Sequence, residues 1–414
     1  MRNRYLVRFF LLFLLAALVL VLFVIWQNPP EPVQTTPSGQ ENQAYSSGTY
    51  PAVVTEILET GTVQLGDRSQ PYQVVQVRLL EGPYAGEFFE VDYGQRQIRP
   101  AELQLRQGER LLVTVSGGLD SGLSAYFTDY VRAPSLLWLL AVFIVFSVLI
   151  SGWKAVRGLI GMALSFAVIL GYIIPQILAG KDPVLVSVTG SFAVMLVTLY
   201  IVYGWTLKTH AAALGTLIAL ALTGLIAVYF MNLTRLTGFG GEEALFLIQQ
   251  AGFQINLRGL LLGGFLIGVL GVLDDLVITQ SSVVFELLSA DPRLSYRPLF
   301  QRAMTVGRDH VAATVNTLVL AYTGAALPVL LLFSLSGQQL GNLFNLEFVA
   351  EEIVRMLVGS LGLMAAVPVT TALACWLALH ADRLGGLRRY LGPSGEGHSH
   401  AHEYAGDNAL ELES

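Results

Sequence analysis

Residues 258–280 read RGLLLGGFLIGVLGVLDDLVITQ, an apolar run with spaced glycines and two adjacent aspartates. The hydrocarbon core of a bilayer is about 30 Å thick, and about 20 apolar residues in a helix cross it. The run therefore predicts a membrane-spanning helix with two carboxyl groups in the inner part of the bilayer. The apolar pattern continues to Leu288, which is too long for a straight crossing. We expect either a break near Gly271 or a helix that extends into the cytoplasm.

The composition of the whole chain agrees with a membrane protein. Of 414 residues, 54% are hydrophobic and 13% are charged, and the mean hydropathy is +0.59. Soluble domains have about 25% charged residues, so a cytosolic enzyme or a disordered protein is excluded. The net charge of −6 and the lack of basic patches exclude a nucleic-acid partner. The single cysteine, Cys375, excludes a disulfide or a cysteine-based zinc site within one chain.

Seven further apolar runs predict a mainly α-helical membrane protein with about eight transmembrane helices: 6–26, 135–152, 156–179, 184–206, 211–231, 311–334 and 355–380. Lys and Arg concentrate in every second loop, which predicts a multi-pass membrane protein with both termini in the cytoplasm. Residues 1–27 are predicted to be an uncleaved signal-anchor helix, because its end lacks the small residues that a signal peptidase needs.

The segment between the first two predicted spans differs from the rest. Residues 28–48 are rich in Pro, Gln, Ser and Thr and predict a flexible tether. Residues 49–132 alternate polar and apolar side chains between glycines, which predicts a small extracytoplasmic β-barrel or β-sandwich. This β-domain is expected to shape the outer mouth of the helical domain or to bind a protein partner.

The helical domain is predicted over residues 133–385, with about seven spans, and a disordered cytoplasmic tail over 386–414. The tail contains His398, His400 and His402 on alternate positions, which can share a transition metal. Histidines in a flexible tail bind metal weakly, so this site has little weight.

Polar residues inside the predicted spans are functional candidates, because charged groups in hydrocarbon are costly. On a helix, Asp275, Thr279, Ser282 and Glu286 form one stripe, with Asp274 beside it and Gln280 close by. Carboxylate and hydroxyl oxygens are the ligands of a hard cation or of a proton relay. The alternative is that the aspartates only terminate the span at the inner interface.

A second polar cluster opens the predicted span 311–334. It consists of Arg308, Asp309, His310, Asn316 and Thr317. His310 is expected to titrate near neutral pH if it lies close to an aspartate, or else to be a helix-entry residue at the headgroup level. An offset of 100 residues aligns His210 with His310 and the span 211–231 with the span 311–334, which suggests a parallel repeat.

Residues 271–280 and 307–322 resemble the corresponding motifs of the YibE/F family of bacterial multi-pass membrane proteins. The similarity extends over about residues 150–380, and the order of anchor, β segment and helical domain is also similar to that family. The resemblance implies a polytopic plasma-membrane protein and supplies no activity.

The favoured hypothesis is a permease-like transporter of a small solute or cation, with a polar pathway between the sixth and seventh spans. Asp274, Asp275, Thr279 and Asp309 would bind a cation or proton, and His310 would relay protons. The chain has no nucleotide-binding motif, so transport would use an ion or proton gradient. No cofactor is expected; the expected partners are the lipid bilayer, the transported solute, and a second copy or another protein through the β-domain.

Two other hypotheses remain open. The protein is either a non-transporting scaffold or sensor that binds a partner through the β-domain, or an intramembrane enzyme that uses the aspartate pair as a general acid and base.

Overall fold

The computed structural model describes residues 48–66, 68–100, 104–118, 122–251, 255–335 and 340–381. The predicted signal-anchor helix (1–27), most of the predicted tether and the predicted tail with its histidines lie outside the described residues. The chain divides into two compact units, a β unit that includes the first long helix and a helical unit that begins at Ser151. Each unit is described by itself.

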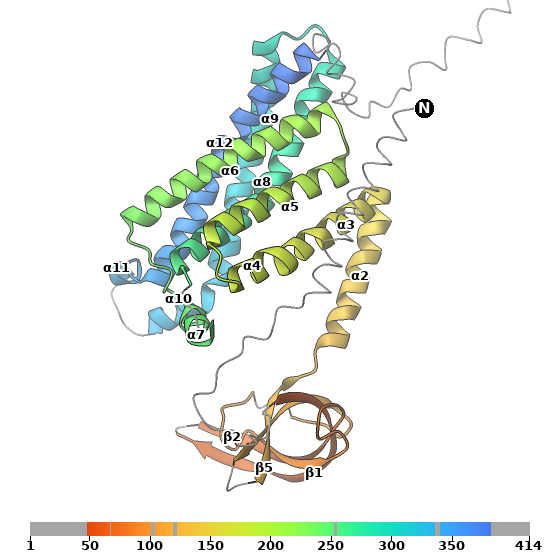
Figure 1. The fold of residues 1–414 in the computed structure, drawn as a ribbon, viewed down its shortest axis with the longest axis vertical. Coiled ribbons are helices and arrows are strands. Elements are labelled where there is room, and N and C mark those ends of the chain that lie inside the picture. Colours follow the sequence, from red (N-terminus) through yellow and green to blue (C-terminus); the bar gives the residue numbers. More distant parts are fainter. Residues whose placement is uncertain are drawn as a thin grey trace, which may run out of the picture. The chain divides into compact units, whose positions relative to one another are not determined.

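The β unit is a five-stranded antiparallel sheet (Figure 1). Its strand order is β3-β2-β1-β4-β5, with bounds β1 (Gly48–Leu65), β2 (Arg68–Leu79), β3 (Phe88–Tyr93), β4 (Arg110–Gly118) and β5 (Gly122–Tyr130). Tyr93 of β3 and Tyr130 of β5 share a hydrogen bond of 2.6 Å between their hydroxyls, and the ring of Phe127 packs edge-on against both. The two end strands are thereby joined, and the sheet has the form of a partly closed barrel.

Alternating side chains of these strands form the core of the barrel. Val75 and Val77 of β2 face inward with Val91, Leu111 and Val113, and all five are fully buried. This is the period-2 pattern that the sequence predicted for residues 49–132.

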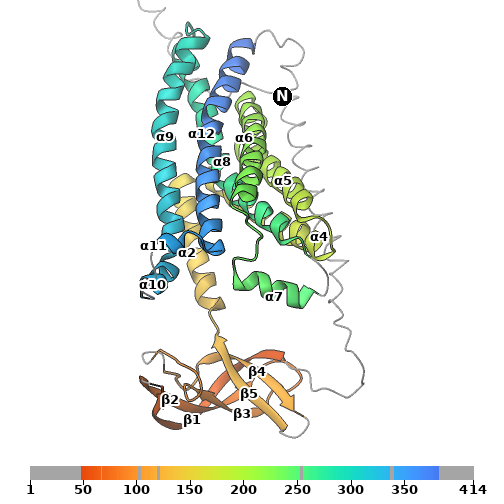
Figure 2. The ribbon, with the colours of Figure 1, turned by 90° about the vertical axis from the view of Figure 1, so that its left-hand side faces the viewer.

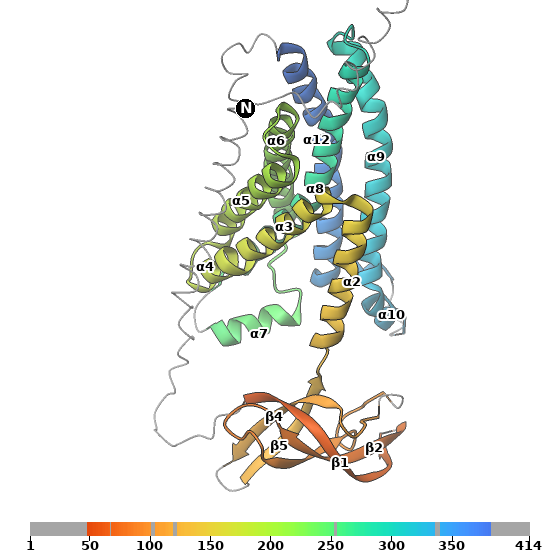
Figure 3. The ribbon, with the colours of Figure 1, turned by 90° about the vertical axis from the view of Figure 1, so that its right-hand side faces the viewer.

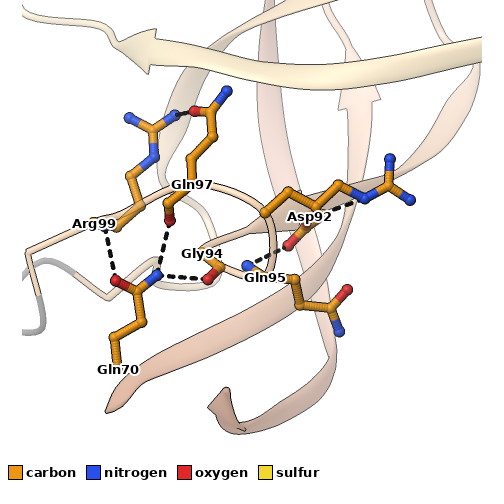
Figure 4. A network of polar contacts seen from close by, with 7 residues as sticks. Gln70, Asp92, Gly94, Gln95, Gln97 and Arg99 are labelled. Atoms are coloured by element: carbon orange, nitrogen blue, oxygen red, sulfur yellow. Dashed lines mark hydrogen bonds and ion pairs between the residues drawn. The ribbon is translucent and has the colours of Figure 1, made fainter. Parts of the chain in front are cut away.

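Two buried glutamines of β2 fasten the long connection between β3 and β4. The Gln70 amide donates to the carbonyls of Gly94 and Gln97, and its oxygen accepts from the backbone N–H of Arg99 (Figure 4). Gln73 bonds the backbone N–H and carbonyl of Leu105 in the same way. These side chains satisfy backbone groups that have no strand partner, so the connection is held without secondary structure of its own.

The helix α2 (Ala133–Ser151) follows β5 and has no buried residue. It is apolar on every side, which is typical of a helix surrounded by lipid. At its start Arg132 pairs with Asp129 at 2.7 Å. The hydrogen bond from Arg132 holds the pKa of the Asp129 carboxyl below its usual value.

The described part of the helical unit contains six long helical segments, one of which is α3 with its continuation to α4, and several short helices (Figure 2). They are α3 (Trp153–Val168), the π-helical turn η1 (Ile169–Ile173), α4 (Ile174–Leu178), α5 (Pro183–Tyr203), α6 (Leu207–Leu233), α7 (Glu242–Ala251), α8 (Leu257–Ala290), α9 (Tyr296–Ala325), α10 (Leu327–Leu335), α11 (Leu340–Leu343) and α12 (Glu347–His380). The central helix is α8, which packs against α5, α6, α9 and α12. Its leucines form the main apolar core together with valines of α12 and alanines of α6.

Small residues allow these helices to approach closely. A Cβ atom at Gly215 of α6 would lie 2.3 Å from Thr370 Oγ1 of α12, and a Cβ atom at Gly362 of α12 would lie 2.2 Å from Thr223 Oγ1 of α6. The α6–α12 interface therefore includes two reciprocal glycine–threonine contacts. Packing through small residues is typical of helices that associate within a membrane.

Six helical segments of the described residues are long and apolar enough to cross a membrane: Ala133–Ser151, Trp153–Leu178, Pro183–Tyr203, Leu207–Leu233, Leu257–Ala290 and Glu347–His380. They correspond to six of the eight predicted spans, and the first predicted span lies outside the described residues. The predicted span 311–334 is divided between α9 and α10, because the helix ends at Ala325 and a new helix begins at Leu327. Eight crossings therefore stay a prediction.

The expected break near Gly271 is absent, since α8 runs unbroken for 34 residues. At about 1.5 Å per residue this helix is about 50 Å long. It is longer than the hydrocarbon core is thick, which agrees with the other expectation, a helix that extends beyond the membrane.

Candidate functional site

The most open face of α8 carries the predicted polar stripe. Counting along the helix, the exposed or half-buried residues of this face recur every three or four positions: Gly264, Gly268, Gly271, Asp275, Thr279, Ser282 and Glu286. Within the described residues, a Cβ atom at Gly264 or Gly271 would meet no heavy atom within 4 Å. We call these seven residues the open stripe. It joins a glycine surface at one end to carboxylate and hydroxyl oxygens at the other.

Asp274 lies beside the open stripe and is directed to a different helix. Thr198 Oγ1 of α5 lies 3.0 Å from Asp274 Oδ2 and donates a hydrogen bond to it. The other carboxyl oxygen, Oδ1, is buried and has no hydrogen-bond partner among the described residues. Asp275 is exposed on the open stripe. The two adjacent carboxyl groups therefore point in different directions.

Gln280 and its neighbour Ser281 connect α8 to three other helices. The buried Gln280 amide donates to the carbonyl of Ala303 of α9 at 3.0 Å and to Thr371 Oγ1 of α12 at 2.7 Å. Ser281, which the sequence analysis did not single out, donates to the carbonyl of Lys208 at the start of α6. Gln280 thus acts as a structural link rather than as part of the open stripe.

The helix α9 runs antiparallel to α8, and two contacts fix their register. A Cβ atom at Gly307 would lie 2.8 Å from Gln280 Oε1, and one at Gly268 would lie 3.9 Å from Tyr322 Oη. This register places the half-buried His310 near the level of Val277, between the levels of Asp275 and Thr279 of α8. Among the predicted residues 308–310, His310 is the half-buried one, whereas Arg308 and Asp309 are exposed.

The other predicted residues of α9 are exposed: Arg308, Asp309, Asn316 and Thr317. Because a helix turns about 100° per residue, Asp309 and Asn316 lie on the side almost opposite to Gly307, which faces α8. The Thr317 hydroxyl donates to the carbonyl of Ala313 in its own helix. The structure therefore does not bring Asp309 and Asn316 together with the aspartates of α8.

His210 lies near the start of α6 in an aromatic cluster. Its Nδ1 is 2.8 Å from the hydroxyl of Tyr200, and its ring packs edge-on against Trp205. The alanines that follow His210 are buried, whereas Ala312 and Ala313, which follow His310, are exposed. The two helices of the suggested repeat therefore have different surroundings at equivalent positions.

Arg355 of α12 lies near the glycine end of the open stripe. It forms an ion pair of 2.5 Å with Glu352, and its guanidinium lies 5.1 Å from the centre of the Phe265 ring of α8. It also lines a cavity of about 10 Å³ together with Gly268 and Tyr322. A cavity of this size holds about one water molecule.

No group of three or more His, Cys, Asp or Glu side chains that could hold a metal occurs in the part of the chain that the structure describes. His398, His400 and His402 lie outside that part. The tail site therefore stays a prediction.

The comparison with known proteins gives one match. A family model described as YibE/F-like protein matches residues 139–380, which is more than half of the chain. No curated protein and no solved structure matches the chain.

Proposed function

Since the chain belongs to the YibE/F-like protein family and has several helices apolar enough to cross a membrane, we propose that it is a permease-like transporter. It moves a small solute or cation along the open stripe of α8, and a proton or ion gradient drives the movement. Asp274 binds the proton, and the oxygens of Asp275, Thr279 and Ser282 line the path.

The hydrogen bonding of Asp274 supports this proposal most strongly. Thr198 Oγ1 lies 3.0 Å from Asp274 Oδ2 and 2.8 Å from the carbonyl oxygen of Val194. A hydroxyl has one hydrogen, so it can donate to only one of these two acceptors at full strength. If Asp274 carries a proton, its own O–H donates to Thr198 Oγ1, and the threonine hydrogen stays with Val194. When Asp274 is protonated, the carboxyl hydrogen of Asp274 bonds to Thr198 and the hydroxyl hydrogen of Thr198 bonds to Val194. When Asp274 is ionised, the single Thr198 hydrogen faces two acceptors, and one of them is left without a donor.

The buried Oδ1 atom of Asp274 also favours the protonated form. An ionised carboxylate oxygen without a donor is costly in a buried position, whereas the carbonyl oxygen of a neutral acid is less so. Release of the proton is therefore expected to require that Asp274 gain a new partner, such as a cation or water on the adjacent open stripe. This requirement would couple the movement of the proton to that of the solute.

The remaining parts of the path are assigned from position. His310 lies between the levels of Asp275 and Thr279 and would pass protons between the stripe and the end of α9, while Glu286 would attract cations where α8 extends beyond the membrane. We further propose the plasma membrane as location, cytoplasmic termini, an extracytoplasmic β unit, and α9 with α10 as an additional crossing.

A flux measurement in proteoliposomes tests this function. Vesicles with an enclosed pH-sensitive dye would be given an imposed membrane potential, with sodium, potassium or magnesium ions as probes. We expect protein-containing vesicles to take up protons faster than empty vesicles with at least one probe. Asp275→Asn should lower this rate strongly, because it removes a charge from the path.

Asp291→Asn is the matched control, because Asp291 is a surface residue that directly follows α8 and pairs with Arg302 at 3.8 Å. Its rate should equal that of the unmodified protein. Equal rates for empty and protein-containing vesicles with all three probes would contradict cation transport. They would favour the scaffold or sensor, which the separate core of the β unit also allows.

The divergent directions of Asp274 and Asp275 give little support to the acid–base enzyme. A carboxyl dyad that shares a proton needs its two groups in contact. Here one carboxyl bonds to α5 and the other is exposed.

A further inference from the structure

The short helix α7 has exposed apolar side chains and lies at one end of the helical unit. Figures 2 and 3 show it lying across this end, with its axis transverse to α6 and α12. In sequence, α7 lies between the end of α6 at Leu233 and the start of α8 at Leu257. Because α6 and α8 are both candidate membrane spans, a helix between their adjoining ends is expected at the edge of the bilayer.

The helix α7 exposes more large apolar side chains than is usual for a surface helix in water. Leu245, Phe246 and Ile248 are exposed by 49%, 60% and 36% of their surface. Single exposed apolar residues are common, but three on a helix of 10 residues form a patch that indicates a binding surface. Glu243 and Gln250, which lie about 20° apart around the helix axis, supply a polar side.

Hydrogen bonds join the loop before α7 to the first turns of α12 and thereby hold α7 near the start of that helix. Glu347 accepts from the backbone N–H groups of Thr237 and Gly238 and from the Thr237 hydroxyl, at 2.5, 3.0 and 2.7 Å. Glu351 accepts from the N–H of Gly240 at 3.3 Å. The loop before α7 is thus tied to the start of another span.

Gly238 makes this close approach possible. Its φ of 86° is rare for residues with a side chain, and a Cβ atom there would lie 2.6 Å from the carbonyl oxygen of Leu257, the first residue of α8. The loop therefore contacts the first residues of both α8 and α12, and α7 cannot move far from the level of these helix ends.

We infer that α7 is an interfacial helix that binds the lipid surface, with Leu245, Phe246 and Ile248 at the boundary between head groups and acyl chains. Helices that lie flat in this boundary bury one apolar side and leave a polar side in the head groups. The inference rests on the membrane-spanning helices and is independent of the proposed transport.

The charge of α7 indicates that apolar rather than electrostatic interactions would hold it at the lipid surface. The helix has no Lys or Arg, and its first turn contains Glu242 and Glu243. Electrostatic attraction to anionic lipids cannot hold such a helix at the surface, so burial of apolar side chains must do so. Binding is therefore expected to be the same with zwitterionic and with anionic lipids.

Spin labelling of the full chain in vesicles tests the inference. The only cysteine, Cys375, is buried and would be changed to alanine, after which Leu245→Cys and Ile248→Cys would each be labelled. Collisions with oxygen, which concentrates in lipid, and with a water-soluble nickel complex would be measured in phosphatidylcholine vesicles and in mixtures with phosphatidylglycerol. Both labels should favour oxygen over nickel, to the same extent in both kinds of vesicle.

Two control positions set the scale. A label at Gln250→Cys, on the polar side of α7, should favour nickel, and a label at Leu225→Cys, which is 69% exposed on α6, should show the strongest preference for oxygen. Equal nickel contact at Ile248 and Gln250 would overturn the inference. Exclusion of both reagents from Leu245 and Ile248 would also overturn it, because a protein surface would then cover α7.

Discussion

Asp274→Asn is expected to lower the proton flux to the level of vesicles without protein. Asparagine has nearly the same shape, and its amide can donate to or accept from Thr198 Oγ1, which lies 3.0 Å from Asp274 Oδ2. It cannot bind and release a proton in the physiological range, so a path that depends on this carboxyl stops. The measurement is proton uptake in the proteoliposome assay, with the amount of folded protein in the vesicles checked for each variant.

Substitutions of Thr198 separate the role of the carboxyl from that of its partner. Thr198→Val removes the hydroxyl and should slow the flux, but less than Asp274→Asn does, because the carboxyl remains. Thr198→Ser keeps the hydroxyl and should restore most of the rate. Unchanged flux in Asp274→Asn would show that this carboxyl only supports the fold.

Gly215→Ala is expected to lower the free energy of unfolding by about 1–3 kcal/mol, the usual effect of overpacking. The added Cβ would lie 2.3 Å from Thr370 Oγ1 and 3.3 Å from the Thr370 Cα atom, so that α6 and α12 must separate. Denaturation with sodium dodecyl sulfate in mixed micelles measures this free energy. Gly215→Leu should prevent the two helices from packing.

Gly271→Ala is the matched control for this substitution. A Cβ atom at Gly271 would meet nothing within 4 Å among the described residues, and alanine favours a helix more than glycine does. Its stability should stay the same or rise slightly. Adding Thr370→Ala to Gly215→Ala should recover part of the loss; equal stabilities of Gly215→Ala and Gly271→Ala would contradict the described α6–α12 interface.

The spans themselves could be predicted well from the sequence. The predicted spans 135–152 and 184–206 agree closely with Ala133–Ser151 and Pro183–Tyr203, because hydropathy over about 20 residues is a strong signal. The span 311–334 was a weaker case. Its apolar residues cross the junction between α9 and α10, and hydropathy alone does not show where a helix ends.

The arrangement of the site could be predicted only in part. Helical periodicity placed Asp275, Thr279, Ser282 and Glu286 on one face, and in the structure these four share the most open face of α8. Periodicity also separates Asp274 from this face, but it does not say which helix lies there. A single sequence does not determine which helices are neighbours, so the contact of Asp274 with Thr198 was not foreseen.

A single sequence also does not determine which side of α9 faces α8. For this reason only some of the predicted polar residues of α9 lie near α8. Asp309 and His310 are adjacent in sequence, yet His310 is half-buried and Asp309 is exposed on the other side of α9. The angle between neighbouring side chains is known from the sequence. The side of α9 that packs on α8 is set by Gly307 and by its close contact with Gln280.

The most direct test of the account is whether water reaches the open stripe inside the membrane. In the Cys375→Ala background, single cysteines at Gly264, Gly271 and Thr279 would be treated with a charged, membrane-impermeant thiol reagent. Leu225→Cys serves as the lipid-facing reference and Ile278→Cys as the buried one, since Leu225 is 69% exposed and Ile278 is 2% exposed. The account predicts that the three stripe cysteines react quickly and both references slowly. Stripe cysteines as unreactive as Leu225→Cys would show that lipid or another helix covers this face, and would contradict a pathway along α8.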